Sequence, residues 1–148
     1  MDKSMVIMIG IQGSGKSEYV KRFLSEDYVH VSLDILHTRK KERLLIEECL
    51  SSGKSFVVDN TNPTQEERAR YIPEAKEHGY RVIGIFVQSV LKDCIERNSR
   101  REGKTCVPVN AIACTSNRLE MSDYSEGFDE LYFVHNEGDV MWKEEWRT

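Results

Sequence analysis

The chain has 148 residues, of which 39% are hydrophobic and 31% are charged, and this length and composition predict one folded domain. Its formal net charge of −4 excludes an overall cationic field, so any site for a polyanion must be a local patch. No apolar run reaches the roughly 20 residues of a membrane helix, and the N-terminal apolar stretch is too short for a signal peptide. The four cysteines form no C-x-x-C pair, so we expect reduced thiols in a cytoplasmic protein.

Short apolar runs alternate along the chain with longer segments of helical spacing. The runs that predict strands are, in chain order, 5–9, 28–31, 56–58, 82–87 and 131–134. The segments that predict helices are 17–24, 35–50, 64–78 and 89–101, and Pro108 is placed to open another. This alternation predicts an α/β fold with a mostly parallel five-stranded sheet and helices on both faces. Ligands of such sheets bind at the carboxyl ends of the strands.

Residues 10–17 read GIQGSGKS and match the phosphate-binding (Walker A) pattern G-x-x-x-x-G-K-[ST] in full. The match follows the first predicted strand and opens the first predicted helix. Its glycines let backbone N–H groups surround an anion, and the helix N-terminus adds partial positive charge. We expect Lys16 to reach the β- and γ-phosphates of ATP and Ser17 to hold Mg²⁺. Further nucleotide contacts are expected from Gly10, Gln12, Gly13, Ser14 and Gly15.

Two acids stand at the ends of predicted strands. Asp59 follows the apolar run 56–58, as in a Walker B element, where an acid holds Mg²⁺ or orients Lys16 and Ser17. The alternative is a turn or helix-capping aspartate. Asp34 closes the second predicted strand and is placed to accept a proton from an attacking hydroxyl. Capping the helix that begins at Ile35 is an equal alternative for Asp34, and one residue could do both.

Two basic stretches have a functional and a plain interpretation. Residues 97–104 carry four cations, and a lid there would bring Arg97 and Arg101 onto the phosphates. A solvated helix end is the alternative. Residues 39–43, RKKER, are either a solvated helix face or a contact for the phosphate backbone of an acceptor strand. We expect a single P-loop kinase domain over 1–148, with a lid at about 97–108 and a short C-terminal tail at 137–148.

Taken together, these features resemble the kinase domain of polynucleotide 5′-hydroxyl kinases over roughly residues 5 to 134. The stretches that carry the resemblance are Gly10–Ser17, Asp34, GKSFVVDNTNP at 53–63, RNSRR at 97–101, VPV at 107–109 and EGFDE at 126–130. The resemblance implies a P-loop NTPase-type three-layer sandwich with a helical lid. It also implies transfer of the γ-phosphate of ATP to the 5′-hydroxyl of DNA or RNA. In that reaction Lys16 and Ser17 bind ATP–Mg²⁺, Asp34 is the general base, Asp59 supports the metal, and Arg101 with Arg97 contacts the phosphates.

The chain departs from the family pattern at the acceptor side. The family usually has Asn-Arg-Asp at the catalytic strand end, where this chain has SLD at 32–34. His37 and Lys41 stand where family members place an arginine that grips the acceptor. ATP use is therefore better supported than a single-stranded nucleic acid 5′ end as acceptor. A kinase of small-molecule hydroxyls and a nucleotide-binding module without turnover stay as alternatives. No Asp-x-Asp of the accompanying phosphatase occurs.

Overall fold

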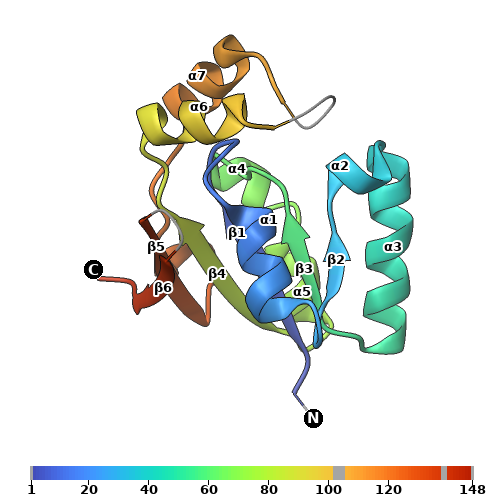
Figure 1. Ribbon diagram of the computed structural model, residues 1–148. Coiled ribbons are helices and arrows are strands. Elements are labelled where there is room, and N and C mark those ends of the chain that lie inside the picture. The colour runs from blue at the N-terminus through green and yellow to red at the C-terminus, as the bar shows by residue number, and fades with distance from the viewer. Residues whose placement is uncertain (1, 102–105, 138–139, 148) are drawn as a thin grey trace.

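The computed structural model describes residues 2–101, 106–137 and 140–147. In this part of the chain, a six-stranded sheet has the order β2-β3-β1-β4-β5-β6 (Figure 1). The strands are β1 (Ser4–Ile9), β2 (Val29–Val31), β3 (Phe56–Asp59), β4 (Arg81–Val87), β5 (Glu130–Glu137) and β6 (Val140–Glu145). The first five pair in parallel and β6 is antiparallel to β5. The predicted α/β fold is confirmed, but the segment predicted as a tail contributes a sixth strand.

Helices follow the strands as predicted, but two of them are interrupted. The helices are α1 (Lys16–Tyr19) continuing into the π-helix η1 (Val20–Leu24), α2 (Leu33–Leu36), α3 (Arg39–Ser52), α4 (Gln65–Arg68), α5 (Ile72–Glu77), α6 (Leu91–Ser99), α7 (Val109–Arg118) and the 3₁₀ helix η3 (Tyr124–Glu126). The prediction of one continuous helix over 35–50 was wrong. His37 takes a left-handed φ of 70° and ends α2, and the Thr38 side chain caps α3 by accepting from the Lys41 N–H.

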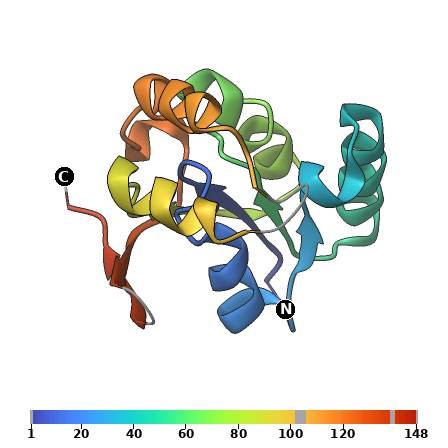
Figure 2. The ribbon, with the colours of Figure 1, turned by 45° about the horizontal axis from the view of Figure 1, so that its top comes forward.

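Helices cover both faces of the sheet. Alternate residues of β1 point to opposite faces, so each face has its own core cluster. Ile7 lies in a core cluster with Ile46 of α3 and Ile72 of α5, on one face. Met8 lies in a second cluster with Val20 of η1, on the other face. The helices α6 and α7, yellow and orange in Figure 2, lie at the end of the sheet where β1 runs into α1. A third cluster, Ile11, Cys94 and Ile112, joins them to the loop after β1.

The two tryptophans of the C-terminal segment pack against the sheet. Trp146 lies 5.5 Å from the ring of Phe86, centroid to centroid, and Trp142 stacks on His135 at 4.8 Å. Both contacts help to hold the edge of the sheet at β6. Among the described residues, no helix has the length and apolar character to cross a membrane.

Candidate active site

The loop between β1 and α1 has the backbone shape of an anion cradle. Gly13 and Gly15 have φ of 81° and 103°, a region that favours glycine. A Cβ on Gly13 would lie 2.3 Å from the carbonyl oxygen of Cys94, so a side chain there would clash with α6. The first N–H groups of α1 have no partner within the helix and are available to an anion. This geometry is that of a phosphate-binding loop.

Residues from two other strand ends fix both halves of the loop. The Gly10 N–H donates to the Thr61 carbonyl, which follows β3, at 3.0 Å. The Asn136 side chain, near the end of β5, donates through Nδ2 to the Ser14 carbonyl at 2.7 Å. Asn136 carried no readable signal in the sequence, because its partner lies 122 residues away.

Lys16 is the centre of a cluster of charges. Its side chain folds back over the loop, and Nζ donates to the Ile11 carbonyl at 3.0 Å. Burial lowers the pKa of Lys16, and the charge of Asp59 opposes that lowering. The charge of Arg101 lowers the pKa of Lys16 further, while Asp34 raises it. The structure therefore brings these four predicted site residues within electrostatic reach of one another, although they come from four separate segments.

Asp59, the last residue of β3, is buried beside Ser17. Its Oδ2 accepts from Ser17 Oγ at 2.8 Å and forms a hydrogen bond with His30 Nε2 at 2.7 Å. Burial alone would raise the pKa of Asp59, but the hydrogen bond from His30 and the charge of Lys16 outweigh it and hold the pKa below its usual value. Asp59 is therefore ionised at neutral pH. The N-cap of the following helix α4 is Thr64, and His30 is a neighbour that the sequence analysis missed.

The donors of this corner fit a magnesium ion. Asp59 Oδ1 is buried and has no hydrogen-bond partner among the described residues. It belongs to the carboxylate that already touches the Ser17 hydroxyl. Mg²⁺ is commonly bound by one or two protein oxygens together with substrate phosphates, which matches this donor set. Among the described residues, no group of three or more His, Cys, Asp or Glu side chains offers another metal site.

Asp34 lies in the first turn of α2, and its side chain is exposed. β2 ends at Val31, so Asp34 does not close the strand as expected. The helix is capped by Ser32, whose Oγ accepts from the Asp34 N–H at 3.2 Å. The alternative in which Asp34 caps the helix is therefore wrong. Its carboxylate is left open to solvent at the edge of the site.

The two predicted lid arginines differ in what they contact. Arg97 in α6 donates from Nη1 to the Gly13 carbonyl and from Nη2 to the Asn136 carbonyl, both at 3.3 Å. It thus touches the backbone of the phosphate loop, where we had predicted a contact with phosphate. Arg101 follows α6 with an exposed side chain, and its charge acts on Lys16. The predicted lid spans 97–108, and its residues 102–105, with Lys104, lie outside the described residues.

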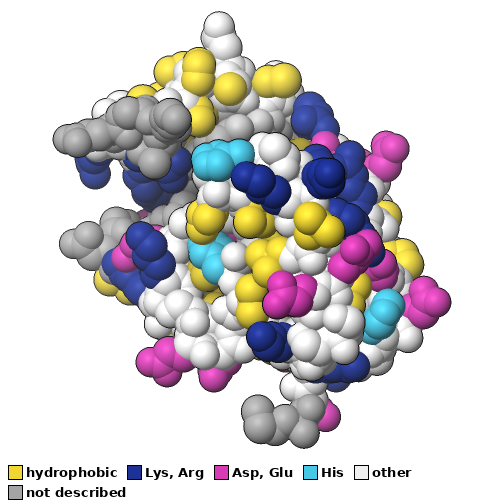
Figure 3. Space-filling view, turned by 90° about the vertical axis from the view of Figure 1, so that its right-hand side faces the viewer, with side chains coloured by type: hydrophobic (Ala, Val, Ile, Leu, Met, Phe, Trp, Pro, Cys, Tyr) yellow, Lys and Arg dark blue, Asp and Glu magenta, His cyan; other side chains and the backbone are white. Residues whose placement is uncertain are grey.

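The predicted basic cluster at 39–43 is partly paired. Arg39 binds Glu42 at 2.9 Å, and Arg43 binds Glu47 at 2.9 Å and also Glu74. Lys40 and Lys41 are exposed. Figure 3 shows the face that α2 and α3 build, with Lys and Arg side chains gathered in its upper part. The lysines, more than the two arginines, are open to a ligand.

A buried arginine braces the loop after β3. Arg68 is fully buried, and its Nε donates to the Asn62 carbonyl at 2.9 Å. Its Nη2 donates to the Pro63 carbonyl at 3.1 Å, and its Nη1 pairs with Glu126 at 3.1 Å. The guanidinium thus ties the loop that follows Asp59 to the segment before β5. Nothing in the local sequence marks Arg68, because Glu126 is 58 residues away.

Replacing Arg68 by methionine is expected to lower the free energy of unfolding by about 3–5 kcal/mol, because the buried carboxylate of Glu126 then loses its cation and keeps, among the described residues, only the hydrogen bond from the Asp123 N–H. Urea denaturation measures this loss. Arg43→Met is the matched control, since Arg43 and its partners Glu47 and Glu74 are half exposed, and such a pair contributes at most about 1 kcal/mol. Equal losses in the two variants would contradict a bracing role for Arg68.

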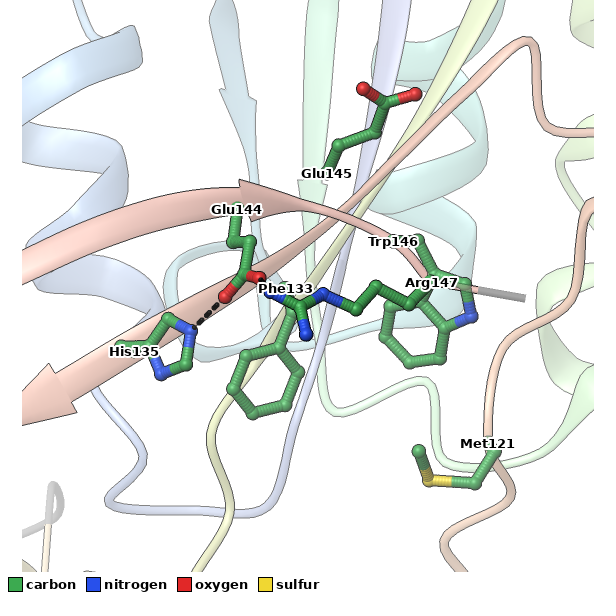
Figure 4. Close-up of a pocket in the computed structure, with 7 residues that line it drawn as sticks. All are labelled: Met121, Phe133, His135, Glu144, Glu145, Trp146 and Arg147. Atoms are coloured by element: carbon green, nitrogen blue, oxygen red, sulfur yellow. Dashed lines mark hydrogen bonds and ion pairs between the residues drawn. The ribbon is translucent and has the colours of Figure 1, made fainter.

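A cavity of about 290 Å³ lies at the edge of the sheet that β5 and β6 form (Figure 4). It is lined by Met121, Phe133, His135, Glu144, Glu145, Trp146 and Arg147. The His135 ring binds Glu144 at 2.8 Å across it. None of these lining residues belongs to the candidate active site, although Asn136 of the same strand β5 contacts the phosphate loop.

Comparisons with known proteins show what the chain is similar to. Residues 38–122 match a family model described as AAA domain. The chain is 47% identical to a "Putative bifunctional polynucleotide phosphatase/kinase" of Acanthamoeba polyphaga mimivirus, over 89% of this chain and 33% of the relative. It is 32% identical to the "Bifunctional polynucleotide phosphatase/kinase" of Schizosaccharomyces pombe, over 85% of this chain and 32% of the relative. The chain therefore spans about a third of the length of these relatives.

A solved structure shares the fold. Kti12 of Chaetomium thermophilum, in complex with ADP-AlF3, superposes with a TM-score of 0.65 at 17% identity, over 91% of this chain and 90% of that chain. At this identity the likeness concerns the fold alone. The predicted resemblance to polynucleotide kinase domains is confirmed by the two relatives in sequence.

Proposed function

This chain belongs to the AAA domain family, and we propose that within it the chain is an ATP-dependent kinase that transfers the γ-phosphate of ATP to the 5′-hydroxyl of DNA or RNA. One observation carries the proposal: Lys16, in the phosphate-binding loop, lies within electrostatic reach of Asp34, Asp59 and Arg101. A module that only binds a nucleotide needs no exposed acid at this place. The names of the two relatives in sequence support the same reaction.

We assign the binding roles from the site geometry. The N–H groups of the loop from Gly10 to Gly15 and the ammonium of Lys16 bind the phosphates. Ser17 and Asp59 would hold Mg²⁺, which neutralises charge on the β- and γ-phosphates when it is bound. Asp59 is suited to this because its lowered pKa keeps it ionised. Gln12 and Ser14 complete the proposed nucleotide contacts.

The transfer step needs a base for the attacking hydroxyl and cations that stabilise the charge on the phosphoryl group. The acceptor oxygen forms a bond to the γ-phosphorus while the bond to the β–γ bridging oxygen breaks, so ADP leaves. Asp34 takes the proton of the attacking hydroxyl. Arg101 stabilises the negative charge that develops, as an arginine finger does. Arg97 acts beside it, either through the Gly13 carbonyl of the loop, which it contacts, or on the phosphates after moving.

The acceptor is the part that the site specifies least. An acceptor strand would meet Lys41 and His37 in place of the family's arginine, and the exposed Lys40 and Lys41 favour a phosphate-bearing acceptor. A small-molecule hydroxyl is the second candidate, favoured by the net charge of −4.

A transfer assay with ATP labelled at the γ-phosphate tests the proposal. We expect label on an oligonucleotide with a 5′-hydroxyl and none on the same oligonucleotide with a 5′-phosphate, in which that hydroxyl is already esterified. Label that appears only on small alcohols would move the chain to the second candidate. Tight ATP binding without hydrolysis or transfer would leave only a nucleotide-binding module.

A further inference from the structure

We propose that Glu42 in α3 is a positioning residue that sets the place of Asp34 through the side-chain amide of Asn60. The inference rests on the proposed role of Asp34 as the base. The helix that carries Asp34, α2, is four residues long and has no buried residue. Apart from Leu36, which packs partly against the core, it lacks an apolar anchor. Something other than packing must therefore hold its first turn.

Two side chains hold that turn. The hydroxyl of Ser32 accepts from the Asp34 N–H at 3.2 Å. The amide oxygen of Asn60 accepts from the Leu33 N–H at 3.0 Å. Ser32 belongs to the segment that it caps, whereas Asn60 ties the turn to the loop after β3.

The orientation of the Asn60 amide is fixed by Glu42. Because the Leu33 N–H can only donate, the oxygen of the amide must face it, and the NH₂ group must face the other way. There Nδ2 donates to Glu42 Oε2 at 2.8 Å. An ionised carboxylate only accepts hydrogen bonds, so it excludes the flipped amide, which would turn a second oxygen toward it.

Glu42 is itself held rigidly. Its residue is 4% exposed, and its second oxygen, Oε1, accepts from Arg39 Nη1 at 2.9 Å and from the Tyr71 hydroxyl at 3.0 Å. Burial raises the pKa of Tyr71, and the carboxylate of Glu42 raises it further, so the hydroxyl stays protonated and donates. A buried carboxylate with three donors is satisfied, whereas one without them would be costly.

A continuous line of hydrogen bonds therefore runs from Tyr71, before α5, through Glu42 and Asn60 to the first turn of α2. Asn60 is the next residue after Asp59, so one loop places the proposed metal ligand and the proposed base together. In the sequence, Glu42 looked like part of a solvated basic face. Its partners lie 18 and 29 residues away, and the fold turns it inward.

Exchanging the hydrogen-bond donor and acceptor between Asn60 and Glu42 tests this line of hydrogen bonds. In Glu42→Gln, an NH₂ group faces the NH₂ of Asn60. In Asn60→Asp, two carboxylates face each other. We expect each single variant to lower kcat for oligonucleotide phosphorylation by roughly 100-fold, the order for a misplacement of about 1 Å. In the double variant the new glutamine donates to the new aspartate, and we expect most of the rate to return, with ATP affinity near wild type in all three variants.

Glu47→Gln is the control, since Glu47 lies exposed on the same helix and binds Arg43. A second readout, hydrogen exchange at the Leu33 amide, does not depend on turnover. We expect this exchange to speed up in each single variant and to slow again in the double variant. A variant Glu42→Gln with a lower melting temperature but unchanged kcat and unchanged Leu33 exchange would overturn the proposal. Loss of rate without recovery in the double variant would overturn it too.

The two proposals fail in different ways. A wild-type chain that phosphorylates no oligonucleotide would overturn the proposed function, and Leu33 exchange would still decide whether Glu42 places α2. A wild-type chain that is active, with singles as active as the control, would overturn only the positioning role.

Discussion

Replacing Lys16 by alanine is expected to lower kcat for phosphate transfer by roughly 100- to 1000-fold, the order for loss of one preorganised group that stabilises developing charge. The structural reason is that the charges of Asp59, Arg101 and Asp34 all act on Lys16. Steady-state kinetics with saturating oligonucleotide measure the loss. Because the side chain is buried against the loop, its removal also frees the Ile11 carbonyl.

Lys21→Ala is the control for this experiment. Lys21 lies in η1, in the helical segment that begins with Lys16, but its side chain is exposed. We expect a rate close to wild type for Lys21→Ala and similar melting temperatures for both variants. A Lys16→Ala variant that keeps wild-type kcat, or one that loses activity only because it unfolds, would refute the assigned role.

Replacing Asp34 by asparagine is expected to abolish most transfer and to spare ATP binding. The loss of a positioned base costs about 10²- to 10⁴-fold in rate. ATP affinity is expected to stay near wild type, because Asp34 is exposed and lies in α2, outside the phosphate loop at 10–17. Single-turnover kinetics measure the first effect, and titration with a fluorescent nucleotide measures the second.

Glu66→Gln provides a matched comparison. Glu66 is an exposed acid at the second position of α4, as Asp34 is in α2, and both helices have four residues. Loss of an acid there weakens the interaction with the helix dipole by about 0.3–1 kcal/mol in either case. Equal transfer rates in the two variants would show that Asp34 is only a favourable charge at a helix start.

The sequence predicted those parts of the molecule whose signals are local. The phosphate loop follows from eight consecutive residues, and the parallel strands follow from unbroken apolar runs that only a doubly covered sheet can bury. The sequence analysis missed β6 because it is an edge strand. In it only Met141 is buried, and its apolar residues Val140 and Trp142 are exposed beside charged neighbours.

The parts that sequence reasoning missed depend on distant partners. His30 reads as an ordinary strand residue until β2 and β3 pair and place it on Asp59, 29 residues later. The break between α2 and α3 depends on the left-handed conformation of His37. The sequence gives no sign of it, because the residue there is not a glycine. Sequence spacing did place Asp59 and Lys16 correctly at the same sheet edge. It could not give the contact of Arg97, because which group an arginine reaches is set by tertiary packing.

The shape of the phosphate loop is not a property of its own eight residues. At one end of the loop the Gly10 N–H donates to the Thr61 carbonyl, and in its middle the Ser14 carbonyl accepts from the side-chain amide of Asn136. The same peptide grafted onto another strand–helix junction would lack both anchors, and its glycines would favour many other shapes. The shape of this loop is thus set by β1 together with Thr61 after β3 and Asn136 of β5, and the eight-residue motif is only one part of what determines it.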